Sequence, residues 1–311
     1  MQLKSNIFRA HLALLGANVI YGANYLIAKG IMPHKIGPSA FILIRVIIGG
    51  LLFWLVKQYI SEKIDKKDIF RLAACGFLGV AANQLLFFHG LNLTSPIDAS
   101  IIITSIPVMV MIFSFLILKE KFTPNKLIGL LIGGIGAVFL VWYGKNAEGT
   151  SSFLGNLFVF LNTCSYALYL IFVKPLMKKY KPITVISWVF LFGLVFVFPI
   201  GIHDLIATDF SSFDLNTYLA IGYVVLFTTF LAYFLNIYAL SSVSPTVTSS
   251  YAYVQPVVSF IMVSFYAYLY VQSEYSKDIN FIKILSCILV VIGVYLISRP
   301  ENISTQSQIK N

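Results

Sequence analysis

Several polar side chains of this 311-residue chain lie inside long apolar runs, where a polar group costs free energy unless it is paired or faces a cavity. Arg45 is the most expensive of them, because a charge at the centre of a membrane costs roughly 2.5–3.5 kcal/mol on insertion scales. Its guanidinium could attract a carboxylate or phosphate group of a ligand. It could instead snorkel to the membrane surface or bind carbonyl groups near a helix end, which is the commoner role of an arginine close to the edge of a span.

Two polar stripes follow the helical period. Asn18, Tyr21 and Asn24 recur at intervals of three residues, so on a helix they lie along one face. A second apolar run carries a matching stripe, Asn162, Ser165, Tyr166 and Tyr169. Small amide and hydroxyl groups of this kind suit a cavity for a polar metabolite. The same groups also hydrogen-bond helices to one another in membrane bundles, and of the two roles we expect the cavity.

Other apolar runs carry candidates for the same role. They are Asn83, Gln84 and His89 with Thr228, Thr229, Tyr233 and Asn236, and Thr104, Ser105, Tyr251, Tyr253 and Gln255. The last group surrounds Pro107 and Pro256, and a proline in mid-helix frees a backbone carbonyl, so each could bend at a gate or remain a static kink. The predicted substrate-binding set is Asn18, Tyr21, Asn24, Arg45, Asn83, Gln84, Thr104, Ser165, Tyr169, Tyr233, Tyr253 and Gln255, with Pro107 and Pro256 as gating residues.

The composition indicates an integral membrane protein. The chain is 59% hydrophobic and 11% charged, with a mean hydropathy of +0.87, whereas soluble domains are about 45–50% apolar and about 25% charged. So little charge could not cover a water-facing surface, which excludes a soluble enzyme. The three cysteines all lie in apolar runs, so no disulfide framework is expected.

Ten segments are long enough to cross a membrane core as helices, which takes about 20 apolar residues. They are residues 10–28, 39–59, 69–89, 95–118, 127–143, 153–173, 183–203, 217–238, 245–271 and 281–298. Alternate connections carry sixteen Lys and Arg residues on one side and five on the other, apart from Arg45 inside a span. Because positive charge stays in the cytoplasm, both termini are predicted to be cytoplasmic.

The two halves of the chain repeat each other. The segments 91–96 and 240–245 both begin with Leu and end with Ser-Pro, and Pro107 and Pro256 follow at the same offset of 149 residues. The chain therefore reads as two five-span repeats, 10–143 and 153–298, with a cytoplasmic tail at 299–311. Five is odd, so the second repeat is predicted to enter the membrane inverted. Inverted repeats place a binding site near the midplane and support alternating access.

These residues resemble the drug/metabolite transporter superfamily, specifically its EamA-type ten-helix members. The motifs that carry the resemblance are Tyr21-Gly22-Ala23-Asn24, Lys29, Arg45, Gly90-Leu91, Thr94-Ser95-Pro96, Pro107 and Lys119-Glu120-Lys121-Phe122. The chain has Tyr21 where the family usually has a tryptophan before the glycine. The acidic motif of its second repeat is displaced to Ser273-Glu274-Tyr275. These motifs indicate the family and not the substrate, because the family handles amino acids, nucleosides, drugs and other metabolites.

The absence of several motifs narrows the function. There is no phosphate-binding loop of the G-x-x-x-x-G-K-[ST] type, the four histidines are scattered, and no acidic residue lies securely within a span. ATP hydrolysis is excluded, no metal or cofactor is expected, and facilitated export or exchange is favoured over proton symport.

We therefore expect a secondary transporter of small polar metabolites in the cell membrane of a bacterium, in contact with lipid and not with nucleic acid. The resemblance implies export, amino acids or related compounds as substrates, and a monomeric transport unit. The alternatives are a nucleoside or phosphorylated-metabolite exchanger and, more remotely, a membrane-embedded enzyme or a lipid scramblase.

Overall fold

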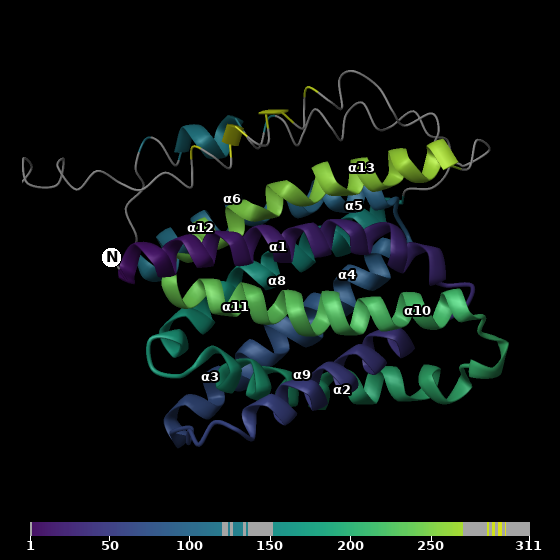
Figure 1. Cartoon of the computed structure of the whole chain (residues 1–311), viewed down its shortest axis with the longest axis horizontal. Helices are drawn as coiled ribbons and strands as arrows, with labels where there is room; N and C mark the ends of the chain where they lie inside the picture. The colour runs from purple at the N-terminus through teal and green to yellow at the C-terminus, as the bar shows by residue number, and fades with distance from the viewer. Residues whose placement is uncertain are drawn as a thin grey trace, which may run out of the picture.

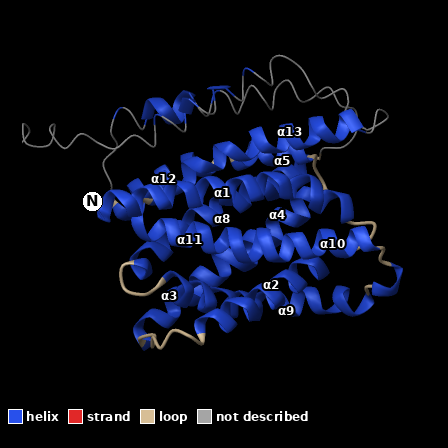
Figure 2. Cartoon of the chain, in the orientation of Figure 1, coloured by secondary structure: helices blue, strands red, loops and turns tan. Residues whose placement is uncertain are grey.

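The computed structural model describes residues 2–119 and 152–269, together with residues 124, 127–132, 135, 285, 288, 289, 292, 293 and 296. Within these ranges the chain is helical and contains no strand (Figure 2). Most of the predicted spans 127–143 and 281–298, the tail 299–311 and the motif residues at 120–122 and 273–275 lie outside the described residues.

Six described helices are long and apolar enough to cross a membrane, judged by length and composition. They are Asn6–Ile31, Pro38–Lys57, Lys66–Asn92, Phe153–Met177, Pro182–Ala207 and Leu215–Ser242. They match the first, second, third, sixth, seventh and eighth spans predicted from the sequence. Their outward side chains are strongly apolar, with Phe153 83% exposed and Ile206 79% exposed. The all-helical membrane architecture is thereby confirmed.

Four of these spans are continuous α-helices: α1 (Gln2–Ile31), α2 (Pro38–Lys57), α8 (Phe153–Met177) and α9 (Pro182–Ala207). α2 and α9 both start on a proline, which fits the first turn because the N–H it lacks would have no intrahelical partner there. α2 packs along α9, and α1 packs against both α11 and α13 (Figure 1).

The third and eighth spans each contain a π-helical segment. The third begins with the short 3-10 turn η1 (Lys66–Asp68) and consists of α3 (Ile69–Gly76), π-helical η2 (Phe77–Ala82) and α4 (Asn83–Asn92). The eighth consists of α10 (Leu215–Tyr223), π-helical η5 (Val224–Leu231) and α11 (Ala232–Ser242). Shifting η2 by the repeat offset of 149 residues places it inside η5, so the same irregularity occurs at the same place in both halves. Such π segments often occur at functional sites.

The fourth and ninth predicted spans are interrupted rather than continuous. The fourth is divided into α5 (Pro96–Ile103), α6 (Ile106–Phe113) and π-helical η3 (Ser114–Leu118). The ninth is divided into α12 (Pro245–Ser250), the 3-10 turn η6 (Tyr251–Tyr253) and α13 (Val254–Leu269). Pro107 and Pro256 lie in the first turns of α6 and α13, so each proline follows an interruption at the start of a new helix instead of kinking a continuous one.

The ends of the helices gather at two faces. At the N-terminal face, Ala10 of α1 packs in one cluster with Ala239 near the end of α11. α8 also ends there, because the Lys174 Nζ donates to the carbonyl oxygen of Leu240 at 2.5 Å. The beginning of α1 and the ends of α8 and α11 therefore share one face.

The opposite face holds the end of α1, the end of α4 and the beginning of α8. The Lys29 Nζ donates to the carbonyl oxygens of Leu91 at 3.0 Å and Asn92 at 2.8 Å. The backbone N–H of Ser152, just before α8, donates to the carbonyl oxygen of Leu93 at 3.0 Å. Consequently α1 and α8 run in opposite directions through the bundle.

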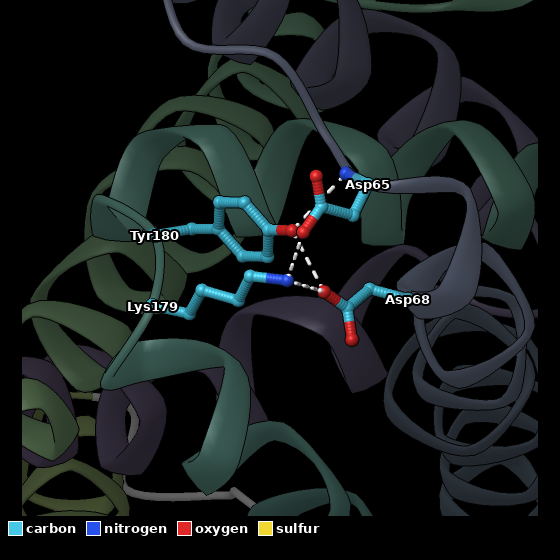
Figure 3. A network of polar contacts seen from close by, with 4 residues as sticks. All are labelled: Asp65, Asp68, Lys179 and Tyr180. Atoms are coloured by element: carbon cyan, nitrogen blue, oxygen red, sulfur yellow. Dashed lines mark hydrogen bonds and ion pairs between the residues drawn. The ribbon is translucent and has the colours of Figure 1, made fainter.

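Two loops meet at the N-terminal face in a polar cluster that we call the loop network: Asp65, Asp68, Lys179 and Tyr180 (Figure 3). The Lys179 Nζ donates to Asp65 and, at 2.6 Å, to Asp68. The Tyr180 hydroxyl donates to Asp68 Oδ2 at 2.7 Å and accepts the backbone N–H of Asp65 at 3.1 Å. The loop after α2 is thus joined to the loop after α8.

Candidate functional site

A cavity of about 90 Å³ lies inside the bundle, between helices from both halves of the chain. This exceeds the volume of about 10–15 Å³ that a single water molecule requires, so the cavity has room for more than one. Its wall, called the cavity wall below, consists of Asn18, Tyr21, Asn24, Tyr25, Arg45, Asn83, Gln84, Phe87, Phe88, Ile103, Ile106, Asn162, Tyr166, Thr228, Tyr233, Asn236, Thr248, Ser249, Ala252 and Gln255.

Eight of the twelve residues predicted to bind substrate belong to this wall: Asn18, Tyr21, Asn24, Arg45, Asn83, Gln84, Tyr233 and Gln255. The structure thus brings the polar stripe of α1 together with candidates from α2, α4, α11 and α13. The other four, Thr104, Ser165, Tyr169 and Tyr253, are buried outside the wall. Pro107 and Pro256 are also outside it.

A hydrogen-bonded chain joins α1 to the start of α13 on one side of the cavity. The Tyr25 hydroxyl donates to Gln255 Oε1 at 2.6 Å, and Gln255 Nε2 donates to Asn18 Oδ1 at 2.7 Å. Asn18 Nδ2 in turn donates to the Leu14 carbonyl oxygen at 2.8 Å. Because all three side chains are at most 7% exposed, these bonds hold their orientation toward the cavity.

Arg45 is the charged member of the cavity wall. Its side chain is only 2% exposed. Its Nε donates to Thr229 Oγ1 of η5 at 2.8 Å, and its Cζ lies 4.2 Å from the centre of the Phe88 ring. Thr229 donates its own hydroxyl to the Val224 carbonyl oxygen at 3.0 Å, so the acceptor is itself held in place. The guanidinium therefore stays within the bundle and does not snorkel to a membrane surface.

The π-helical segment η2 exposes backbone carbonyls that neighbouring helices satisfy. Ser165 Oγ of α8 donates to the Leu78 carbonyl oxygen at 2.7 Å. The Tyr233 hydroxyl lies 3.3 Å from the Gly79 carbonyl oxygen and 3.2 Å from Asn83 Oδ1. Irregular backbone inside a membrane is tolerated where such partners exist. Ser165 is thereby committed to the backbone of η2, which explains its place outside the cavity wall.

The remaining predicted residues outside the wall are held by packing. A Cβ built on Gly79 would lie 2.4 Å from the Tyr169 ring, so this ring fills the space that the glycine leaves. Tyr253 is fully buried in a cluster with Met111 and Leu130. Thr104 lies at the interruption between α5 and α6 and is 3% exposed.

Sequence reasoning did not select several residues of the cavity wall. Tyr25 lies four residues after Tyr21, and this helical spacing was a signal for it. Ser249 stands at the position that matches Ser100 in the other repeat, which was a second signal. Phe88, Ile103, Ile106, Thr248 and Ala252 also line the cavity. The apolar members of this group give no sequence signal, because apolar residues occur throughout every span.

The family comparison matches nearly the whole chain. The model of the EamA-like transporter family matches residues 8–142 and again residues 153–299. A crystal structure matches 97% of this chain and 99% of its own chain with a TM-score of 0.69 and 16% identity, a likeness that shows the fold alone.

Similar proteins come from bacteria, archaea and plants. The uncharacterized transporter YetK of Bacillus subtilis is 26% identical over 294 residues, which cover 94% of this chain and 86% of the relative. An uncharacterized transporter of Archaeoglobus fulgidus is 26% identical over 266 residues, covering 86% of this chain and 90% of the relative. A WAT1-related chloroplastic protein of Arabidopsis thaliana is 23% identical over 296 residues, covering 93% of this chain and 69% of the relative. The chain is a multi-pass protein of the cell membrane and belongs to the EamA-like transporter family.

Proposed function

We propose that this chain is a secondary transporter that moves small polar metabolites through its central cavity by alternating access. The observation that carries the proposal is a cavity lined by buried amides, hydroxyls and one guanidinium inside an apolar helical bundle. Polar groups placed inside a membrane protein usually line a pathway. Helices of both halves contribute to this cavity, which is the arrangement that rocking of the two halves requires.

The same proposal includes ten membrane helices in two inverted five-helix repeats with both termini in the cytoplasm. The opposite directions of α1 and α8 support it, as do the two separate matches to the family model. The excess of Lys and Arg in the connections at the N-terminal face supports the assignment of that face to the cytoplasm. All the described residues of the cavity wall come from one chain, so we propose a monomeric transport unit surrounded by lipid.

The loop network is the proposed closure on the cytoplasmic side. It joins the loop after α2 in one half to the loop after α8 in the other, so these contacts must separate when the halves open toward the cytoplasm. Export requires that opening in order to load substrate. Pro107 and Pro256 are proposed to allow bending at the interruptions of the fourth and ninth spans.

Amino acids or related compounds are the proposed substrates, and export is the proposed direction. The family resemblance supports amino acids, and nucleosides and phosphorylated sugars are the alternative substrates. A membrane-embedded metal-dependent or aspartyl hydrolase would need facing acidic or histidine side chains, and none lines the cavity in the part of the chain that the structure describes.

Counterflow into liposomes that contain the purified protein tests the proposal. The liposomes are preloaded in turn with amino acids, nucleosides and phosphorylated sugars, and uptake of the labelled compound is followed with and without a proton gradient. We expect amino-acid accumulation that is lost in Asn24→Ala, because Asn24 lines the cavity. Ser165→Ala is the matched control from outside the cavity wall and should retain the substrate affinity of the natural protein.

Accumulation of no compound from any of the three classes would contradict transport of small polar metabolites. Accumulation of nucleosides alone would support the transport function but show that nucleosides, and not amino acids, are the substrates. Equal flux in Asn24→Ala and the natural protein would contradict a transport pathway through this cavity.

A further inference from the structure

Arg45 has hydrogen-bonding capacity that the described residues do not use. Nε is committed to Thr229, and Phe88 covers one side of the guanidinium. Nη1 is buried and has no hydrogen-bond partner among the described residues. A guanidinium presents a planar fork of donors that matches a carboxylate, so part of the fork remains for a bound group.

The charge of Arg45 is also uncompensated within the cavity. None of the described residues that line it is Asp or Glu. Burying a charge costs several kcal/mol unless an opposite charge and hydrogen bonds offset that cost. The neighbours that the structure provides are a threonine hydroxyl and aromatic rings, which offset only part of it. A bound anion would supply the missing partner.

A second set of polar atoms without partners lies in the same cavity wall. Asn24 Oδ1 is buried and accepts no hydrogen bond from the described residues. The Gln84 amide is likewise buried, and neither its oxygen nor its nitrogen forms a hydrogen bond of acceptable geometry there. Buried polar atoms are normally satisfied, so these amides indicate a ligand with its own hydrogen-bonding groups. An acceptor oxygen suits an ammonium or hydroxyl donor.

We propose that the cavity selects small carboxylates that also carry an amino or hydroxyl group. Arg45 binds the carboxylate, and Asn24 and Gln84 bind the amino or hydroxyl group. This inference rests on the proposed transport function and names the chemistry of its substrates. A carboxylate fits better than a phosphate monoester, because one guanidinium balances one negative charge and a phosphate monoester carries about 1.5 to 2 negative charges at pH 7.

Ligand-induced thermal stabilisation of the purified protein tests this inference without requiring transport. The acids are alanine, serine, threonine, lactate and glycerate, and the matched probes without a carboxylate are alaninamide, serinamide and threoninamide. Glycerol phosphate tests the phosphate alternative. We expect the melting temperature to rise with at least one of the acids and to stay unchanged with the amides.

Variants of Arg45 then test whether this residue causes the stabilisation by the acids. Arg45→Gln keeps the size and removes the charge, and should weaken the apparent affinity for the acids about tenfold or more, as expected for loss of a charged hydrogen bond. Arg45→Lys should retain part of that affinity. Thr229→Val removes the acceptor of Nε and should give a smaller loss, which checks the positioning if Arg45→Gln folds poorly.

The outcomes separate the two proposals. Stabilisation by the amides as strong as by the acids, by glycerol phosphate alone, or by none of the probes overturns the carboxylate inference. An apparent affinity for the acids that is unchanged in Arg45→Gln overturns it as well. In any of these cases, counterflow of another solute would leave the transport function standing. Binding of acids without counterflow of any solute would contradict transport instead.

Discussion

Lys29 and Lys174 make the same contact in the two halves of the chain. Each ammonium group donates to two backbone carbonyl oxygens at the end of the third membrane span of its own half. Lys174 donates at 2.5 and 2.6 Å to two carbonyl oxygens at the end of α11. The last carbonyls of a helix have no intrahelical partners, and a cation there also interacts favourably with the helix dipole.

Removing either lysine should therefore destabilise the fold. Lys29→Gln or Lys174→Gln removes the positive charge and shortens the side chain, which weakens or breaks its hydrogen bonds to the carbonyl groups at a helix end and should cost about 1–3 kcal/mol. The melting temperature in detergent measures the effect, and Lys178→Gln, at an exposed loop position, is the control. A melting temperature of either variant equal to that of Lys178→Gln would show that these contacts contribute nothing.

Gly22 allows α1 to approach α13 closely beside the cavity. A Cβ at this position would lie 2.5 Å from the Val258 Cβ and 3.0 Å from the Gln255 carbonyl oxygen. We expect Gly22→Ala to separate the two helices and to lower stability by about 1–3 kcal/mol, as overpacking does. Its melting temperature and counterflow rate should both fall.

Gly16→Ala is the matched control in the same helix. Its Cβ would meet only Leu235 Cδ1 at 3.8 Å, an ordinary contact, and alanine favours a helix over glycine by about 1 kcal/mol. This variant should be neutral or more stable than the natural protein. A similar fall in melting temperature in Gly16→Ala and Gly22→Ala would show that the effect is not specific to the close approach at Gly22.

Replacing Gln255 should lower the stability of the fold more than replacing either of its hydrogen-bond partners. Gln255→Ala leaves the Tyr25 hydroxyl without its acceptor and Asn18 Oδ1 without its donor, at an expected cost of about 1–3 kcal/mol. Tyr25→Phe removes one bond and should cost about 0.5–1.5 kcal/mol. Tyr253→Phe is the control, because its hydroxyl has no partner among the described residues. Denaturation experiments measure the free energy of unfolding of each variant. An equal loss of stability in Tyr253→Phe and Gln255→Ala would contradict a stabilising role for these hydrogen bonds.

Lys179 should influence the equilibrium between the forms of the protein that are open at one face or at the other. It should not make that equilibrium depend on pH between about 6 and 9. Hydrogen bonds to Asp65 and Asp68 raise the pKa of Lys179 above its ordinary value. A raised lysine pKa keeps the interaction fully present below the unfolded-state value of about 10.4 and loses it only as pH rises through the folded-state value. Lys179 therefore remains charged between about pH 6 and 9.

Lys179→Ala should shift the protein toward the form that is open at the N-terminal face, while Lys179→Arg should retain the natural balance. Limited proteolysis of the 58–65 and 178–181 loops in inside-out vesicles measures this shift. Faster cleavage in Lys179→Ala at every pH between 6 and 9 is the expected result. Equal cleavage of both variants would show that the loop network does not hold this face closed.

The sequence predicted the six described membrane helices because about 20 consecutive apolar residues are an unambiguous signal. It could not predict the π-helical segments η2 and η5, since they depend on carbonyl partners from other helices, such as Ser165. The prolines indicated irregular spans, but the site of each interruption emerged only in three dimensions.

The cavity wall was partly predictable for a related reason. Helical spacing placed Asn18, Tyr21 and Asn24 on one face, and the structure places all three in the wall. Spacing does not reveal which neighbour competes for a polar group. Ser165 lies on an equally polar stripe but binds the Leu78 carbonyl oxygen, and Tyr169 fills the space beside Gly79.

Alternating access requires that one cavity be reached in turn from both faces. It is tested most directly at Ser249, which lines the cavity and is 2% exposed. Ser249→Cys is made in a variant in which Cys75, Cys164 and Cys287 are replaced by alanine. It is then treated with a membrane-impermeant thiol reagent in right-side-out and in inside-out vesicles, with Ser165→Cys as the control outside the cavity wall. We predict labelling of Ser249→Cys from both faces, slowed from each face by the transported compound. Labelling from one face only, or at a rate that the compound does not change, would contradict alternating access through this cavity.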